Sequence, residues 1–189
     1  MNKQIVKEPN TVLHAHAAEI PIAEISSKKI RQVIQEMKDA LRKTADGIGI
    51  AAPQIGYSLR IFLASEEALR WKKTDENSVK NSANEEEPEQ KDILWEYYVF
   101  VNPVIIKASR KKSSEAEGCL SVPGTYGTVS RADKVTVETY DEQGNKFIRG
   151  TSGLYARVIQ HEIDHLNGIL FISKAHDLKK ITRKPNQDA

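Results

Sequence analysis

Cysteine is nearly absent from this sequence: its 189 residues include only Cys119, which excludes an internal disulfide framework. No apolar run approaches the roughly 20 residues that a membrane-spanning helix requires, and the N-terminus lacks the apolar core of a signal peptide. Neither sign of charge dominates, because 28 basic and 26 acidic residues leave a formal charge of +2. The single cysteine and the absence of an apolar segment lead us to expect a reducing, cytoplasmic location. The overall charge identifies no partner.

The hydrophobic pattern predicts a single α+β domain over residues 1–189. Apolar residues recur at spacings of three and four between Ile30 and Leu41, which predicts an amphipathic helix over residues 26–45. A second helix is expected over residues 153–167. Strands are expected at residues 59–64 and 97–106, and a hairpin is expected from residues 135–139 and 147–148.

Residues 66–96 differ in composition from the rest of the chain. They hold ten acidic and five basic side chains, so their charge of −5 leaves +7 for the remaining residues. Such a segment has too few apolar residues to form a core, which predicts a charged surface insertion. The basic tail from about residue 174 is interpreted as a solvated surface segment.

The sharpest chemical pattern lies in residues 161–165. His161 and His165 are four positions apart on a predicted helix, so both imidazoles lie on one face and can reach one metal ion. Glu162, beside the first histidine, can act on a water at that metal. The alternative is two unrelated histidines on a helix.

The third metal ligand is inferred by elimination. No glutamate follows His165, which removes the downstream ligand of one class of zinc peptidases, and Phe171 occupies the position where another class has a histidine. His176 lies in the polar tail, where surface exposure is expected. Cys119 remains the strong candidate; a lone cysteine is more often core packing, but beside an incomplete histidine pair the balance favours a ligand.

Residues 47–54 form a third distinctive segment, rich in glycine and alanine and ending in Gln54. It follows a predicted helix, whereas a dinucleotide-binding loop follows a strand. Small residues allow a backbone to approach a ligand closely. A tight helix-to-strand connection is an equally good explanation of this segment alone.

Together, residues 47–54, 117–121 and 160–166 resemble the three motifs of the peptide deformylase family, in the same order. These are a Gly-rich segment ending in Gln, a Glu-Gly-Cys-Leu segment and a Gln-His-Glu-x-x-His-Leu segment. The likeness covers about residues 26–172, and the acidic insertion is its main departure. The resemblance implies mixed or antiparallel sheets around a central metal-binding helix.

The resemblance also implies an activity, which is the hydrolytic removal of the formyl group from the N-terminal formylmethionine of new polypeptides. Cys119, His161 and His165 would hold the metal, expected to be Fe²⁺, with Zn²⁺, Ni²⁺ or Co²⁺ able to substitute. Glu162 would carry the proton from water to the departing amine. The side chain of Gln54 and the backbone N–H of Leu120 would stabilise the oxyanion.

A methionine pocket is expected next to the metal. Leu154 and Val158 precede the histidines at helical spacing and therefore share their face. Ile48 and Gly49 would complete an apolar slot from the Gly-rich segment. Each of these residues could equally be ordinary core.

Two other functions are compatible with the motifs. One is a metallopeptidase that cuts internal peptide bonds, against which the missing downstream ligand argues. The other is an inactive relative that binds metal or the ribosome, against which the intact Glu162, Gln54 and Cys119 argue. The expected partners are N-formylmethionyl peptides, with no membrane and no specific DNA. Contact of the basic tail with the ribosome near its exit tunnel is the alternative to a solvated tail.

The charge density of the acidic insertion generates a prediction. Replacing residues 77–90 with a short Gly/Ser linker should leave folding and catalysis nearly unchanged, because the segment cannot bury much apolar surface. Thermal unfolding and steady-state kinetics of the two proteins test this, and a collapse of the melting temperature would contradict it.

Overall fold

The structure is a computed structural model that describes residues 3–44, 47–65 and 97–181. The predicted insertion at residues 66–96 and the end of the basic tail lie outside the described residues, so the domain boundaries stay a prediction. Within the described residues no helix is long and apolar enough to cross a membrane.

The larger sheet has five antiparallel strands in the order β1-β2-β3-β6-β7. β6 and β7 form the predicted hairpin, paired from Lys134 with Ser152 to Tyr140 with Lys146. β3 is irregular at two places along β6, where its register shifts. The strands are β1 (Gly49–Ala51), β2 (Ile61–Ser65), β3 (Tyr97–Ala108), β6 (Lys134–Tyr140) and β7 (Lys146–Ser152).

The smaller sheet has three antiparallel strands in the order β4-β5-β8. They are β4 (Lys112–Cys119), β5 (Val122–Ala132) and β8 (His176–Lys180). β4 and β5 form a long hairpin whose register breaks between Gly118 and Cys119. The break sets Cys119 at the irregular end of the ladder, where its side chain is free to point toward the helix below.

Helix α1 (Lys28–Arg42) covers one side of the larger sheet. The hydroxyl of Ser27 accepts a hydrogen bond from the backbone N–H of Ile30, which satisfies one of the free donors at the helix start. The apolar stripe from Ile30 to Leu41 is buried, as its spacing predicts. It packs with Ile50, Leu63 and other sheet residues in one of two core clusters.

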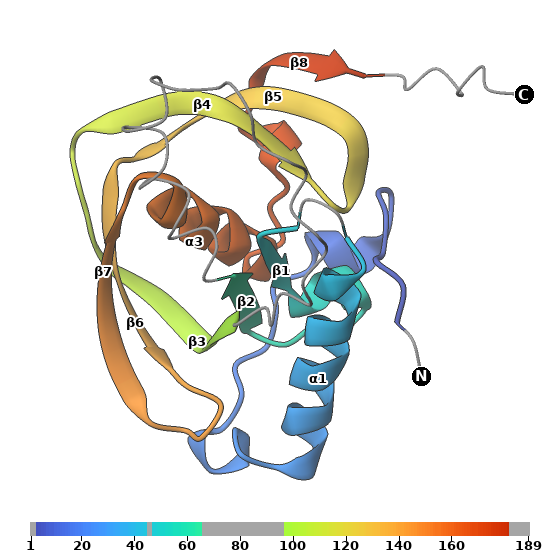
Figure 1. Cartoon of the computed structure of the whole chain (residues 1–189), viewed down its shortest axis with the longest axis vertical. Coiled ribbons are helices and arrows are strands. Elements are labelled where there is room, and N and C mark those ends of the chain that lie inside the picture. The colour runs from blue at the N-terminus through green and yellow to red at the C-terminus, as the bar shows by residue number, and fades with distance from the viewer. Residues whose placement is uncertain (1–2, 45–46, 66–96, 182–189) are drawn as a thin grey trace, which may run out of the picture.

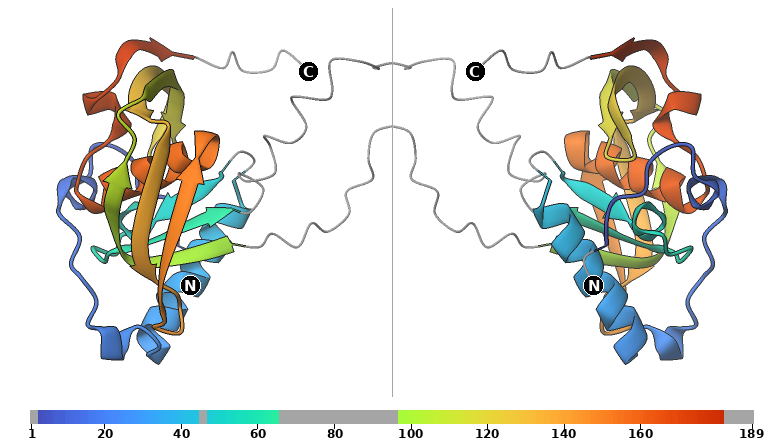
Figure 2. Two further views of the ribbon diagram at one scale, coloured as in Figure 1. Left: turned by 90° about the vertical axis from the view of Figure 1, so that its left-hand side faces the viewer. Right: turned by 90° about the vertical axis from the view of Figure 1, so that its right-hand side faces the viewer.

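Helix α3 (Gly153–Leu166) runs through the centre of the molecule (Figure 1). β4 and β5 arch over it on one side, while β6 and β7 wrap it on the other. The side views show the same arrangement, with α3 between the two sheets (Figure 2). Because it is enclosed, even its charged residues Arg157, Glu162 and Asp164 are buried.

The second core cluster fills the space between α3 and the larger sheet. Its centre is the stacked pair Phe62 and Phe100, whose ring centroids lie 4.4 Å apart. Ala156 and Ile159 of α3 pack in the same cluster. Helix α3 is therefore fixed on the sheet by close packing, which holds the side chains on its opposite face in place.

The predicted α+β class is confirmed, with antiparallel sheets. The first helix ends at Arg42, before the predicted residue 45, and a 3₁₀ turn, Phe171–Ser173, follows the second helix. β4 and β5 are not among the predicted strands. β8 lies in what we expected to be a solvated tail, although its side chains are exposed as predicted.

Candidate active site

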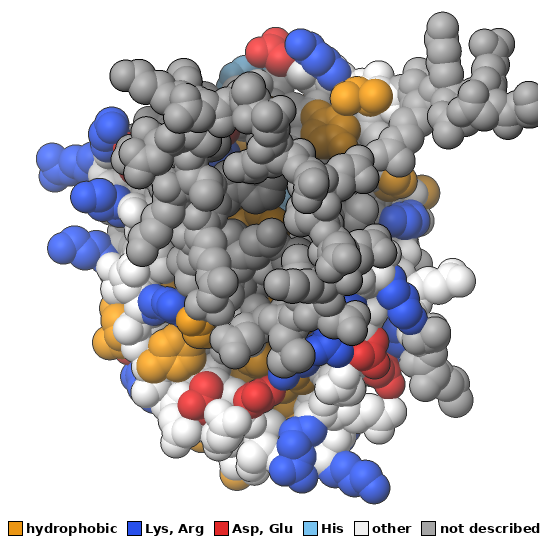
Figure 3. Space-filling model, in the orientation of Figure 1, with side chains coloured by type: hydrophobic (Ala, Val, Ile, Leu, Met, Phe, Trp, Pro, Cys, Tyr) orange, Lys and Arg blue, Asp and Glu red, His pale blue; other side chains and the backbone are white. Residues whose placement is uncertain are grey.

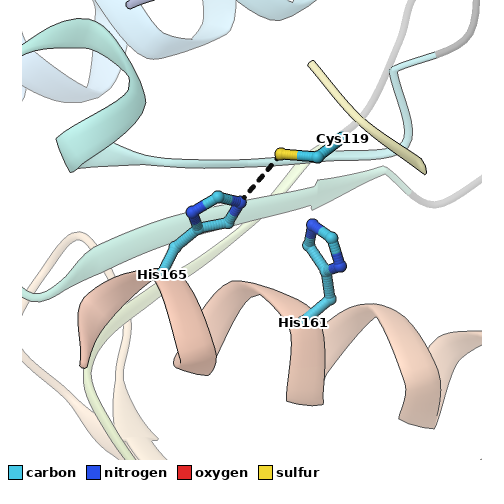
Figure 4. A group of neighbouring side chains, drawn as sticks. All are labelled: Cys119, His161 and His165. Atoms are coloured by element: carbon cyan, nitrogen blue, oxygen red, sulfur yellow. Dashed lines mark hydrogen bonds between the residues drawn. The ribbon is translucent and has the colours of Figure 1, made fainter. Parts of the chain in front are cut away.

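A thiol and two imidazoles meet between β4 and α3. His161 and His165 lie one turn apart on α3, with ring centroids 5.0 Å apart, and Cys119 faces them from the end of β4 (Figure 4). One ligand atom from each residue lies within 4.8 Å of the others, which is close enough to hold a single metal ion. His176 is exposed on β8 and is not part of this group.

The sulfur of Cys119 is surrounded by nitrogen atoms. Nε2 of His165 lies 3.2 Å away, the backbone N–H of Ser121 donates to Sγ at 3.4 Å, and Nε2 of Gln54 donates at 3.5 Å. These contacts fix the position of the sulfur beside both the histidines and Gln54.

The residues present fit a metal ion. Nδ1 of His161 bonds the carboxylate of Glu117 at 3.0 Å, which leaves its Nε2 for a metal, as is usual for histidine ligands. Oε2 of Glu162 and Nδ1 of His165 are buried without a hydrogen-bond partner among the described residues. One sulfur and two nitrogen donors suit Zn²⁺, Fe²⁺, Co²⁺ and Ni²⁺. The set leaves a fourth position for water or substrate.

Beneath the histidines lies a buried ionic network centred on Glu117. Arg131 binds the Glu117 carboxylate through two nitrogens, at 2.6 and 2.8 Å, and Arg157 donates to it at 2.7 Å. Arg131 also donates to Asp164 of α3 at 2.7 Å. The network thus joins β4, β5 and α3 directly behind His161. Removing one partner of such a buried pair typically costs about 3–5 kcal/mol.

The network sets the charge of Glu117. Burial acts to raise the pKa of Glu117, but hydrogen bonds from Arg131 and His161 outweigh it and hold that pKa well below 4.5. Burial likewise acts to lower the pKa of His161, but hydrogen bonds to Cys119 and Glu117 raise it to about 10. A metal cation would take the place of the proton on His161, because metal ligands must be deprotonated.

Glu162 points into the site from α3. Its Oε1 would lie 2.5 Å from a Cβ at position 49, so only glycine fits there without displacing the carboxylate. Burial raises the pKa of Glu162 to about 7, although His161 and Arg131 act to lower it. A carboxyl group that changes charge near neutral pH is suited to accept and return a proton.

Gln54 is held in one orientation. The backbone N–H of Ala51 donates to Oε1 of Gln54 at 2.8 Å, while Nε2 of Gln54 donates to the hydroxyl of Ser121 at 3.2 Å. The amide N–H₂ therefore faces Cys119 and the cavity. Leu120 lies next to Cys119 and lines the same cavity.

A cavity of about 400 Å³ opens over these groups. Ile48 and Gly49 line it from the Gly-rich segment, and Leu154 and Val158 line it from α3. His161, Glu162 and Cys119 form part of its wall, whereas His165 is buried below. The structure thus brings all the predicted site residues to one place. Their individual roles remain predictions.

The supporting network around Glu117 was not predicted from the sequence. Glu117 stands two residues before Cys119 within the same motif, and Asp164 stands within the histidine motif. Arg131 is far from both in the chain and close to both in the fold. The available signal was their position inside or beside the recognised motifs.

Comparison with known proteins gives a family. A sequence model described as polypeptide deformylase matches residues 2–181. "Peptide deformylase 1A, chloroplastic/mitochondrial" of Arabidopsis thaliana is 38% identical over 171 residues, covering 90% of this chain and 60% of the plant protein. A "Peptide deformylase" of Roseiflexus castenholzii is 38% identical over 161 residues, covering 85% of this chain and 80% of the relative.

Solved structures agree. The "Met-ala-ser bound crystal structure of class I type b peptide deformylase from Acinetobacter baumannii" superposes with a TM-score of 0.72 at 33% identity. The alignment covers 90% of this chain and 96% of that structure. The match therefore extends over nearly the whole of that enzyme.

Helix α3 lies between two antiparallel sheets and presents two histidines and a glutamate to a thiol. This arrangement is that of a metal-dependent hydrolase of α+β fold. The chain belongs to the peptide deformylase family. Peptide deformylases remove the N-formyl group from the N-terminus of newly synthesised polypeptides, and membership assigns this activity to the chain.

The low pKa of Glu117 predicts a dependence of stability on pH. A carboxylate whose pKa is lower in the folded chain than in the unfolded chain stabilises the fold above about pH 4.5, and this stability is lost as pH falls. For the metal-free protein, Glu117→Gln should therefore lower the free energy of unfolding at pH 7 and flatten its decline below pH 4.5. Denaturant unfolding across pH 3–7 measures this.

Glu138→Gln is the matched control, because Glu138 pairs with Lys146 at the surface. The control should keep the wild-type dependence on pH. Equal slopes for Glu117→Gln and the wild type would contradict the prediction.

Proposed function

We propose that the chain deformylates N-formylmethionyl peptides with a metal held by Cys119, His161 and His165. The supporting observation is that these three ligand atoms lie within 4.8 Å of one another beside a buried carboxylate. The proposed native ion is Fe²⁺, and the same donors accept Zn²⁺, Ni²⁺ or Co²⁺. The metal would supply a Lewis acid that acidifies water and polarises the formyl oxygen.

Glu162 is the proposed proton carrier. Its pKa of about 7 allows it to accept a proton from the attacking water and then protonate the departing amine. The absence of a side chain at Gly49 leaves the space that the carboxylate occupies. Its Oε2 has no competing hydrogen bond within the described residues, so this oxygen is free for water.

Gln54 and Leu120 are the proposed donors to the oxyanion that forms when water adds to the formyl carbon. The Gln54 amide is already oriented by Ala51 and Ser121, so little reorganisation is needed during the reaction. The backbone N–H of Leu120 would donate a second hydrogen bond to the oxyanion, from the connection between β4 and β5.

The apolar part of the cavity is the proposed methionine site. Ile48, Leu154 and Val158 offer aliphatic walls beside the metal group, and Gly49 leaves room between them. An unbranched thioether side chain adapts well to such a slot. The peptide would continue out of the cavity mouth toward solvent.

The location and the larger partner are also proposals. A reducing cytoplasm suits a chain with one cysteine that serves as a metal ligand. Lysine and arginine side chains are spread around the rim of the face in Figure 3, with fewer acidic side chains among them. We propose weak electrostatic contact with the ribosome near its exit tunnel, through such basic residues.

Cys119→Ala should lose bound metal and deformylase activity together, because two imidazoles alone make a weak site. Metal analysis after anaerobic purification and an assay with a formyl-Met peptide measure both. His176→Ala is the control, since His176 is exposed and outside the group, and it should keep both. Full metal content and normal turnover in Cys119→Ala would refute the assignment.

Glu162→Ala should keep the metal and the fold and lose most of kcat, because Glu117, the other carboxyl group that lines the cavity, is held by Arg131 and Arg157. Gln54→Ala should lose less, about 10²–10³ in kcat, as is typical for one oxyanion donor. Steady-state kinetics on formylated and unformylated peptides measure both variants.

Near wild-type turnover of fully metallated Glu162→Ala would show that another group carries the proton. Cleavage of unformylated peptides at internal bonds would instead indicate a metallopeptidase.

A further inference from the structure

We propose that Lys7 is a positioning residue that acts on the Cys119 sulfur through the peptide bond between Leu120 and Ser121. This inference depends on the proposed role of Cys119 as a metal ligand. It concerns a residue outside the motifs, in the irregular segment that precedes the first helix.

The N-terminal segment is fastened to two parts of the site. The backbone N–H of Val6 donates to the carbonyl of Gln54 at 2.8 Å, and the backbone N–H of Glu8 donates to the carbonyl of Ser121 at 2.9 Å. Lys7 lies between these two anchors. Its backbone is therefore held between the segment that carries Gln54 and the segment that follows Cys119.

The side chain of Lys7 reaches the cavity wall. Its Nζ donates a hydrogen bond to the carbonyl oxygen of Leu120, and Lys7 is among the residues that line the cavity. Among the described residues, no carboxylate pairs with Lys7, and the Leu120 carbonyl is its one polar contact.

The same peptide group touches the sulfur at its other end. Its carbonyl belongs to Leu120 and its N–H belongs to Ser121, and this N–H donates to Sγ of Cys119 at 3.4 Å. One planar amide thus connects the ammonium group to the thiolate. Ser121 is fully buried, so the contact on the sulfur side is shielded from water.

An ammonium group at the carbonyl end strengthens the dipole of the amide, because hydrogen bonds in a chain polarise one another. The N–H then becomes a better donor to sulfur. A thiolate that accepts a stronger hydrogen bond gives less electron density to its metal, which keeps the metal a stronger Lewis acid. Because Lys7 is exposed, solvent reduces this effect and we expect a modest one.

A purely structural contact would have a different outcome. If Lys7 only pinned the segment, its loss would affect stability without changing the electronic state of the sulfur. The distinction requires a spectroscopic signal from the metal–thiolate bond itself, in addition to kinetics.

The test uses the full chain loaded with Co²⁺, whose sulfur-to-cobalt charge-transfer band reports the energy of the thiolate electrons. Lys7→Met should shift this band to lower energy and lower kcat about three- to tenfold with little change in KM, below the 10- to 100-fold usual for buried outer-shell partners. Lys7→Arg should restore both, because it keeps a charged donor.

Lys3→Met is the matched control. Lys3 lies in the same segment and loses the same charge, but its ammonium lies over the Tyr57 ring, 4.6 Å from the centroid. It should leave the band and kcat at their wild-type values. Thermal unfolding of each variant confirms that the comparison is made on folded protein.

The outcomes separate the two proposals. A wild-type protein without a sulfur-to-cobalt band would refute Cys119 as a ligand, and the role of Lys7 would fall with it. A normal wild-type band that Lys7→Met leaves unmoved would overturn the role of Lys7 alone. If Lys7→Met does not fold, the charged variant Lys7→Arg and the neutral variant Lys7→Gln are compared instead. Equal shifts of the band from its wild-type energy in these two variants would then overturn the role of Lys7.

Discussion

The buried carboxylate of Glu117 is the interaction on which the geometry of the site depends. It bonds Arg131, Arg157 and His161 at once, so a single group fixes β4 relative to β5 and α3. Burying such a charge is favourable only because its neighbours supply opposite charge and donors. The orientation of His161 is thus determined by the same bonds that hold the smaller sheet against the helix.

Close packing supplies the second constraint. Helix α3 is enclosed by two sheets, so its residues cannot shift without disturbing the Phe62–Phe100 cluster. Gly49 allows the neighbouring strand to approach the Glu162 carboxylate directly. The backbone anchors at Val6 and Glu8 then close the site from the N-terminal side. Groups far apart in the chain are therefore held within reach of one substrate.

Local patterns in the sequence predicted the parts of the fold that depend on residue spacing along a helix. The histidine pair needs only a helix and a spacing of four, and the stripe on α1 needs only its period. β4 was missed because it is built largely from Ser, Glu, Lys and Gly, and β8 because all its side chains are exposed. Their pairing with β5 stabilises them, and no short stretch of sequence encodes it.

The same argument applies within the site. The candidate metal and pocket residues could be gathered from motifs, and elimination of other ligands pointed to Cys119. The burial of Glu117, Arg131 and Asp164 could not be predicted, since charged residues are normally exposed and their pairing depends on the tertiary fold. Lys7 was equally invisible, because its contact with Leu120 spans 113 positions.

The placement of the thiol and the imidazoles on different elements has one more consequence. Cys119 and His165 are 46 positions apart in the chain, and the whole of β5, β6 and β7 lies between them. An ion bound by both would close this long loop, much as a disulfide does in proteins rich in cysteine. Closing a loop of that length removes conformational freedom mainly from the unfolded chain. In a protein with a single cysteine, the bound ion would therefore act as a cross-link in place of a disulfide, and metal binding would stabilise the folded chain.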